Sequence, residues 1–300
     1  MAISFFNIKK WFKMLTGNSV YHVKQDEGKY YRKDQINGYY NNLTEKVSKF
    51  GEEGLSLPKV DVGTGEEIYL PTAVFQYGLG AYDLFLESKD EIMRERMIVC
   101  SNWALDNQES NGGWRVFEYE NKEQPYSSMT QGEGASLLLR AYKETGDEKY
   151  FTGAKKAVYF MIIPIEEGGT AKYLDDDIYL YEYTYAPLIL NGWIFSYWGL
   201  RDYCIVSSDQ EILNICNKTL ETIIRKLPEF DLGYWSKYDD GKIICSPFYH
   251  NLHIAQMKVM FDLTRIEIFN HYAVLWEGYK HNGWNRIKSL VVKCFQKIFE

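Results

Sequence analysis

The stretch Tyr181-Glu-Tyr-Thr-Tyr-Ala-Pro-Leu-Ile-Leu-Asn-Gly-Trp-Ile-Phe-Ser-Tyr-Trp-Gly-Leu-Arg-Asp-Tyr203 joins a polar loop to a long apolar segment. Glu182 lies between two tyrosines, and Pro187 stands where the apolar part begins. Proline is tolerated in the first turn of a helix, because the N–H group that it lacks would have no helical partner there. We therefore expect a buried helix from Pro187 to Tyr203, with an acid and several phenols in the loop before it. Loops held by a rigid scaffold often carry function.

Segments like this one recur along the chain. Four of them end alike, at Ala81-Tyr82, Ala141-Tyr142, Asp202-Tyr203 and Met260-Phe261, which are 60, 61 and 58 residues apart. Each is followed by a short turn and a more charged segment, as expected for an inner helix paired with an outer one. The repeat predicts an all-α fold, an (α/α) toroid, complete or partial, of about four helical hairpins. A generic α-solenoid, whose loops would share no common site, is the alternative.

The repeat also predicts the domain organisation. Residues 66–300 should form the helical domain, and residues 1–65 an N-terminal region with an amphipathic helix at 1–17 and a small β-hairpin or extended arm. The arm is expected because residues 18–50 alternate in polarity around an Asn37-Gly38 turn. The expected helices are Pro71–Ser88, Asp90–Asn107, Met129–Glu144, Asp147–Ile162, Pro187–Tyr203, Asp209–Leu227, Tyr249–Leu263, Ile266–Lys280 and Trp284–Phe299.

Composition limits the classes of function. With 46% hydrophobic residues and a net charge of -7, the 300-residue chain is typical of a soluble globular protein that does not bind nucleic acid nonspecifically. The aromatic content of 16% suits either helix packing or a sugar-binding groove. Five scattered cysteines without a CxxC motif indicate free thiols in a reducing compartment.

The sequence gives no sign of a membrane span or a leader. No apolar run approaches the length of about 20 residues that spans a bilayer. Lys9 and Lys10 interrupt the apolar residues of segment 1–17, so it does not resemble a signal peptide. We expect a cytoplasmic protein whose residues 1–17 dock on their own chain or, alternatively, contact a membrane surface.

Motifs for metal, nucleotide and triad chemistry are missing. His250 and His253 are three residues apart, which places them on one helix face, but there is no HExxH motif and no third ligand at a suitable spacing. The acidic turn Asp175–Asp177 lacks the pattern of an EF-hand. No GxSxG, Walker A or dinucleotide-binding motif is found. We therefore predict no metal site.

Several segments, taken together and in order, resemble D-glucuronyl C5-epimerases over residues 65–265. They are Tyr69-Leu-Pro-Thr-Ala-Val-Phe-Gln-Tyr-Gly-Leu79; Asn111-Gly-Gly-Trp114; Ser128-Met-Thr-Gln-Gly132 with Leu139-Arg-Ala-Tyr142; Glu182-Tyr183 with Leu190-Asn-Gly192; Asp231-Leu-Gly233 with Tyr238-Asp239; and Tyr249-His250 with His253-Ile254 and Gln256. The resemblance implies an enzyme that converts D-glucuronate to L-iduronate within a heparosan-type polymer or another uronan. Thr184 stands here where the family has proline after Glu-Tyr.

The resemblance also implies site residues. Glu182, Tyr183, Tyr238 and Tyr249 would be catalytic, exchanging the C5 proton on opposite faces of the sugar. The reaction needs no redox cofactor. Family members form dimers, so helix 284–299 is either an interface or packed on its own domain. Substrate-binding side chains are expected to be aromatic or hydrogen-bond donors, namely Trp114, Gln131, Asn191, His250 and His253.

Two other functions remain open from the sequence. If the anion formed at C5 expels the 4-linked sugar, the enzyme is a polysaccharide lyase. A helical module that binds a glycan without catalysis would carry similar aromatic loops. In each case the expected partner is a polysaccharide that contains uronate.

Overall fold

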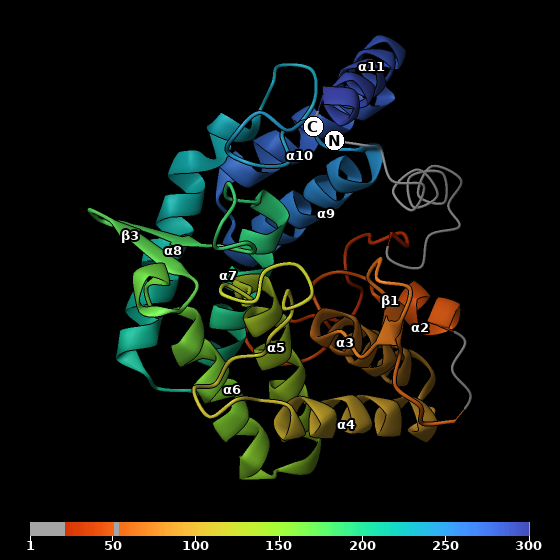
Figure 1. The fold of residues 1–300 in the computed structure, drawn as a ribbon, viewed down its shortest axis with the longest axis vertical. Helices are drawn as coiled ribbons and strands as arrows, with labels where there is room; N and C mark the ends of the chain where they lie inside the picture. Colours follow the sequence, from red (N-terminus) through yellow and green to blue (C-terminus); the bar gives the residue numbers. More distant parts are fainter. Residues whose placement is uncertain (1–21, 51–53, 300) are drawn as a thin grey trace.

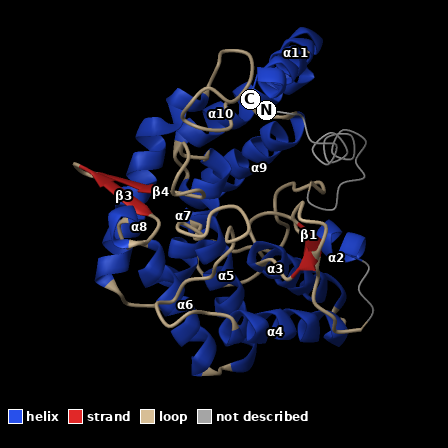
Figure 2. Cartoon of the chain, in the orientation of Figure 1, coloured by secondary structure: helices blue, strands red, loops and turns tan. Residues whose placement is uncertain are grey.

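The computed structural model of this protein describes residues 22–50 and 54–299, and the described part is mostly helical (Figures 1 and 2). The expected amphipathic helix at residues 1–17 lies outside the described residues. The all-α fold is confirmed. The longer helices are α3 (Pro71–Ser88), α4 (Glu91–Asp106), α5 (Ser128–Thr145), α6 (Glu148–Met161), α7 (Leu190–Val206), α8 (Gln210–Lys226), α9 (Pro247–Thr264), α10 (Glu267–His281) and α11 (Gly283–Phe299).

Short elements connect these helices. Helix α2 (Thr44–Phe50) precedes the two-residue strands β1 (Val60–Asp61) and β2 (Glu67–Ile68), which pair antiparallel. Strands β3 (Ala171–Leu174) and β4 (Asp177–Leu180) form an antiparallel hairpin that leads into the loop at Tyr181. Two short 3₁₀ turns, Ile165–Glu167 and Leu227–Phe230, complete the described elements. No helix among the described residues is both long and apolar enough to span a bilayer.

Side-chain caps explain why most outer helices begin where the sequence predicts. Asp90, Asp147 and Asp209 each accept a hydrogen bond from a backbone N–H in the first turn of α4, α6 and α8. The inner helix α7 begins later than the sequence predicts, at Leu190 and not at Pro187. The residues before it are held by a β-bridge between Ile189 and Asp239, so their backbone groups are used outside the helix.

The helices form hairpins arranged in two layers. Helices α3, α5, α7 and α9 contact one another in that order, and each also packs against the helix that follows it in the chain. Helices α5 and α7 approach closely, because a Cβ at Gly199 would collide with the backbone of Gly132. This arrangement agrees with the predicted inner and outer helices. Closure of the hairpins into a toroid stays a prediction.

The first inner helix, α3, ends at a different place in the repeated sequence pattern from α5, α7 and α9. The carbonyls of Tyr142, Tyr203 and Phe261 each accept the backbone N–H that ends their helix. In α3 the carbonyl that accepts this bond belongs to Phe85. The sequence pattern aligned Tyr82 with the other three aromatic residues, but Tyr82 lies almost one helical turn before Phe85. The Ala-Tyr pattern at 81–82 was misleading because Tyr82 and Phe85 are both close to the end of the helix.

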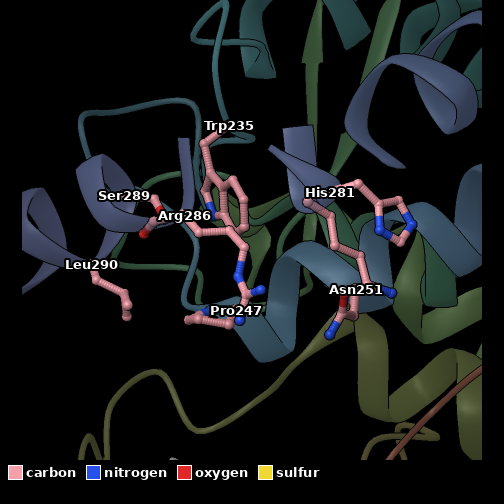
Figure 3. A pocket seen from close by; sticks show the side chains of 8 residues that line it. Trp235, Pro247, Asn251, His281, Arg286, Ser289 and Leu290 are labelled. Atoms are coloured by element: carbon pink, nitrogen blue, oxygen red, sulfur yellow. The ribbon is translucent and has the colours of Figure 1, made fainter. Parts of the chain in front are cut away.

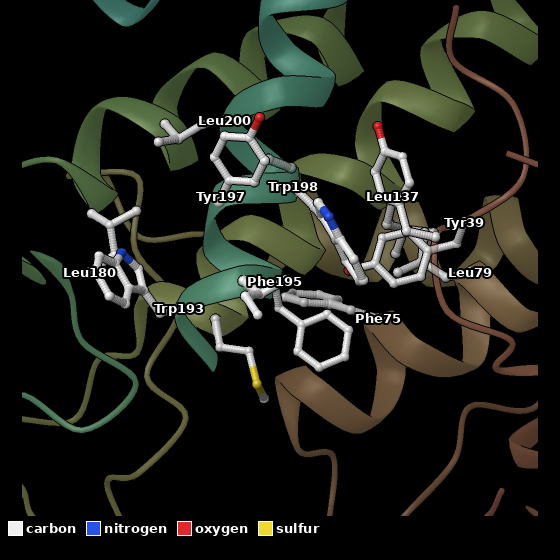
Figure 4. Packing of buried hydrophobic residues seen from close by; sticks show 14 of the residues in the cluster. Tyr39, Phe75, Leu79, Leu137, Leu180, Trp193, Phe195, Tyr197, Trp198 and Leu200 are labelled. Carbon is white, nitrogen blue, oxygen red and sulfur yellow. The ribbon is translucent and has the colours of Figure 1, made fainter. Parts of the chain in front are cut away.

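Large buried side chains fill the centre between the inner helices. Trp193, Phe195 and Trp198 of α7 are no more than 2% exposed. Phe195 and Trp198 contact Tyr39 of the N-terminal arm, whereas Trp193 stacks on Tyr179 of β4 on the other side of the helix (Figure 4). The ring of Tyr39 stacks parallel to that of Phe195, with centroids 6.3 Å apart. The apolar run seen in the sequence is therefore buried on all sides.

The N-terminal arm, residues 22–43, crosses the C-terminal ends of the inner helices. It folds back on itself, with an antiparallel β-bridge between Glu27 and Asn41 and backbone bonds from Gly28 to Tyr40 and from Gly38 to Tyr30. Each inner helix supplies at least one hydrogen-bond partner near its C-terminal end. The bonds join Tyr39 to Asp83 of α3, Gly38 to Arg140 of α5, Tyr40 to Asp202 of α7 and Tyr31 to Asp262 of α9, at 2.7 to 2.9 Å. The arm therefore covers the end of the helices opposite to the loops at 181 and 238.

Candidate active site

Two loops meet at the N-terminal ends of α5, α7 and α9. The first, residues 181–189, is anchored to α5 because Ser128 N–H donates to the carbonyl of Tyr181 at 2.9 Å. The second, residues 231–246, is joined to the first by backbone bonds from Leu190 to Tyr238 and from Asp240 to Leu188. The Asp240 carboxylate also accepts from the N–H of Leu188. These bonds bring residues some fifty positions apart in the sequence into one place.

Glu182 is buried against the first turn of α7. It is 7% exposed, and its Oε2 has no hydrogen-bond partner among the described residues. Gly192 makes room for it, since a Cβ at that position would collide with the glutamate side chain. Burial raises the pKa of Glu182 to about 8. Such a carboxyl group is poised to bind or release a proton near neutral pH.

Three phenols surround this carboxyl group. Tyr238 and Tyr249 contact each other with ring centroids 4.7 Å apart, and Tyr183 stacks on Phe117 at 4.1 Å. All three are half-buried. Burial, followed by the charge of Glu182, raises the pKa of Tyr183 and of Tyr249. A hydrogen bond with the Tyr238 hydroxyl opposes this shift at Tyr249. The structure thus brings the four predicted catalytic side chains together.

Unpaired polar atoms cluster around the same helix ends. Both polar atoms of the Gln131 side chain, the Oδ1 of Asn191 and the Nε2 of His253 are buried without a partner among the described residues. Gln256 is anchored, because its Nε2 donates to the carbonyl of Asn191 at 3.1 Å, while its Oε1 is unpaired. Buried polar groups are normally hydrogen-bonded, and exceptions often mark a functional site.

The two histidines have different surroundings. His250 uses both ring nitrogens, Nδ1 with the Ser236 hydroxyl at 2.8 Å and Nε2 with the carbonyl of Trp276 at 3.0 Å. Its ring also stacks on Trp235 at 3.7 Å, so it fixes the second loop instead of facing an open space. Burial lowers the pKa of each histidine to about 3, which keeps both rings neutral. Only His253 has a nitrogen free of any described partner.

Trp114, expected to line a cleft, lies in the core in this structure. Its side chain is 1% exposed, and its indole N–H donates to the carbonyl of Ala104 at 2.8 Å. It packs beside Phe75 and leaves no room for a Cβ at Gly134. With both faces and the N–H occupied, Trp114 supports the helices behind the site.

Two buried ionisable side chains near the site, Glu133 and Lys46, were not predicted. Glu133 of α5 and Lys46 of α2 are both buried and interact electrostatically, and Glu133 also accepts a 2.8 Å bond from Gln76. Burial raises the pKa of Glu133, whereas it lowers that of Lys46. The charge of Glu182 also raises the pKa of Glu133, so the protonation states of the two acids are linked. Lys46 gives no sequence signal, because a lysine in a charged helix is normally exposed.

An open cavity lies beside the phenols. It has a volume of about 360 Å³, and Tyr119 on its wall is in electrostatic contact with Glu182. A pyranose ring and its neighbours are of suitable size for such a space. The cavity is lined by Ile68, Tyr69, Leu70, Pro71, Arg115, Val116, Glu118, Tyr119 and Lys122. Tyr69 is 44% exposed, so it is the aromatic side chain most accessible to a sugar there.

In fold and site, the chain is an all-α protein with a cluster of one buried acid and three phenols, carried by two loops and the first turn of α9. Comparison with known families identifies it further, because the model of the D-glucuronyl C5-epimerase C-terminus matches residues 108–278, more than half of the chain. The chain belongs to this family, which confirms the resemblance seen in the sequence.

Two relatives show how far the similarity extends. A D-glucuronyl C5-epimerase of Caenorhabditis elegans is 29% identical over an alignment of 219 residues, and the match covers 61% of this chain and 36% of that protein. An uncharacterized protein of Methanocaldococcus jannaschii is 31% identical over an alignment of 182 residues, and that match covers 56% of this chain and 59% of that protein. The match therefore covers less than two thirds of either relative.

Proposed function

We propose that this protein is an epimerase that inverts C5 of D-glucuronate residues within a polysaccharide. The observation that carries the proposal is the meeting of Glu182 with Tyr183, Tyr238 and Tyr249 in one half-buried cluster. Membership of the C5-epimerase family supports the choice of reaction. The polymer is a heparosan-type chain or another uronan.

The chemistry requires that a weakly acidic C–H bond be broken and remade. C5 lies next to the sugar carboxylate, so removing its proton gives a dianion that must be stabilised by hydrogen-bond donors already in place. In the proposed mechanism Glu182 takes the C5 proton from one face, and a tyrosine returns a proton to C5 from the other. The buried amide of Gln131, with no described partner, is a donor available for the substrate carboxylate.

Burial supports these roles. A carboxyl group with a pKa near 8 is a stronger base than an exposed glutamate, and general acid–base groups work best when their pKa lies near the working pH. The hydrogen bond between Tyr238 and Tyr249 opposes the rise that burial causes in the pKa of Tyr249, which favours Tyr249 as the residue that exchanges a proton. Proton transfer by this pair leaves the sugar linkage intact.

The test is incubation with unsulfated heparosan in D2O. We expect deuterium at C5 and the appearance of iduronate in NMR spectra, and we expect the Glu182→Gln variant to show neither at a comparable rate. Ultraviolet absorbance of an unsaturated uronate would show a lyase instead. Binding of the polymer without any C5 exchange by the folded protein would show a non-catalytic glycan-binding module.

A further inference from the structure

Helix α11 packs on the protein through its polar side and exposes its apolar side. Ser289 and Lys293 are buried at 2% and 7% exposure, and Gln296 bonds both the N–H of Ile244 and the carbonyl of Lys242 in the second loop. The large apolar side chains of the helix are instead exposed. They are Trp284 at 79%, Ile287 at 55%, Leu290 at 38%, Val291 at 48% and Phe295 at 58%.

The exposed residues form a continuous stripe. Trp284, Ile287, Val291 and Phe295 are separated by three or four residues, which places them on one face of a helix. Helices of soluble proteins normally turn such a face toward the core. A stripe of this kind, exposed over three helical turns, indicates an interaction surface.

The same region is basic in a chain with a net charge of -7. Residues 278–299 contain five lysine or arginine residues and no aspartate or glutamate. In the described structure, neither Lys280 nor Arg286 pairs with a carboxylate. Lys288 lies 3.7 Å from the ring centroid of Tyr234 at the edge of the stripe.

A pocket at the base of α11 collects part of this charge (Figure 3). Its volume is about 300 Å³, and its wall carries Lys280, His281 and Arg286 beside Ser289 and the ring of Trp235. With about 3.6 residues per turn, Arg286 and Ser289 lie on the side of α11 away from the stripe, so the pocket and the stripe face different ways. Lys288, four residues after Trp284, is the cation that lies beside the stripe. A cation beside an exposed apolar stripe is typical of helices that lie in the plane of a membrane surface.

We propose that the exposed side of α11 docks this protein on an anionic lipid surface. The apolar stripe inserts among the acyl chains, and Lys288 meets the phosphates of the headgroups. A second copy of the chain fits less well, because a two-fold contact through α11 would bring together two segments that each carry five cations and no carboxylate. A soluble polyanion would use the charge but leave Trp284 and Phe295 in water.

The test is co-sedimentation of the full chain with vesicles of equimolar phosphatidylglycerol and phosphatidylcholine, and with phosphatidylcholine alone. We expect binding to the anionic vesicles that weakens as salt is added. Ile287→Gln should weaken this binding about tenfold, and Lys288→Gln about fivefold. The matched control is Ile92→Gln, since Ile92 is 50% exposed on the remote helix α4 and should bind as the parent does.

Three results would overturn the proposal, provided that circular dichroism shows each variant folded. One is a parent protein that stays in the supernatant with anionic vesicles. Another is equal binding by Ile287→Gln and Ile92→Gln, which would place any lipid contact elsewhere in the chain. The third is a dimer in sedimentation velocity that Ile287→Gln dissociates, because the stripe would then be covered by a second copy.

Discussion

Glu182 lies so close to Gly192 that a Cβ at position 192 would be 2.8 Å from the glutamate Cβ and nearer still to its Oε2. The contact places the buried carboxyl group at the first turn of α7, where its backbone and the loop at 181–189 are held together. The position of the proposed base therefore depends on the absence of one methyl group.

Gly192→Ala should displace the Glu182 carboxyl group and slow C5 exchange by more than about tenfold, since small misplacements of catalytic groups are costly. The exchange rate in D2O measures this effect, and urea unfolding measures stability. Gly278→Ala is the matched control, because Gly278 is also helical and a Cβ there would meet nothing within 4 Å. It should raise stability by about 0.5–1 kcal/mol and leave exchange unchanged. Equal exchange rates in the two variants would contradict the role given to Glu182.

Tyr249→Phe removes one oxygen and keeps the ring packing against Tyr238 and Phe248. We expect C5 exchange to fall about 10²–10⁴-fold, which is typical of losing a general acid or base. Tyr142→Phe, which removes a hydroxyl bonded to Glu148 at the other end of the helices, should exchange at the parent rate. A folded Tyr249→Phe protein with the parent rate would exclude a proton-transfer role for this phenol.

Helix positions could be predicted because their signals are local. Asp90, Asp147 and Asp209 mark helix starts as side-chain caps, and the helices that they cap begin within a residue of the expected place. The start of α7 could not be predicted in this way. Pro187 is a valid first-turn residue, but the bridge between Ile189 and Asp239 holds the chain extended beyond it, and that bridge is a long-range contact.

The site was predictable only in part, for a similar reason. The order of the Glu-Tyr, Tyr-Asp and Tyr-His motifs pointed to Glu182, Tyr183, Tyr238 and Tyr249 through a family resemblance. Their surroundings depend on tertiary contacts that leave no local pattern. Lys46 is buried beside Glu133, although each residue considered alone belongs on a surface. Trp114 follows a loop motif and yet lies inside the core.

The raised pKa of Glu182 predicts a pH-dependent cost to stability. Its pKa is about 4.5 when unfolded and about 8 when folded, so the folded state binds one more proton between these values. Stability therefore falls as the pH rises through this window. Glu182→Gln should remove this cost and stabilise the protein more at pH 8 than at pH 5, by on the order of a few kcal/mol.

Chemical unfolding of both proteins at the two pH values measures the difference. The comparison isolates Glu182, because Glu133 and Asp83 are also buried acids with raised pKa values and remain in both proteins. C5 exchange by the parent should rise with pH toward 8, as the base becomes ionised. A stability difference between parent and variant that does not change with pH would show that Glu182 titrates normally.

The buried ion pair of Arg140 and Asp202 should stabilise the helical scaffold. Their side chains are 2.7 Å apart and 1% exposed, and they join α5 to α7 and to the arm through Gly38 and Tyr40. Arg140→Met should cost about 3–5 kcal/mol in urea unfolding, because it leaves the Asp202 carboxylate buried without its cation. The carboxylate retains only the Tyr40 hydroxyl as a partner from the arm.

An exposed pair of the same length provides the control. Arg265 and Asp262 are also 2.7 Å apart, but their side chains are 64% and 45% exposed, so Arg265→Met should cost less than about 1 kcal/mol. Adding Asp202→Leu to Arg140→Met should recover at least half of the lost stability, since no unpaired charge then remains in the core. If the double variant is less stable than Arg140→Met alone, the cost comes from the lost bond to the Gly38 carbonyl and the packing on Tyr39, and not from an uncompensated carboxylate.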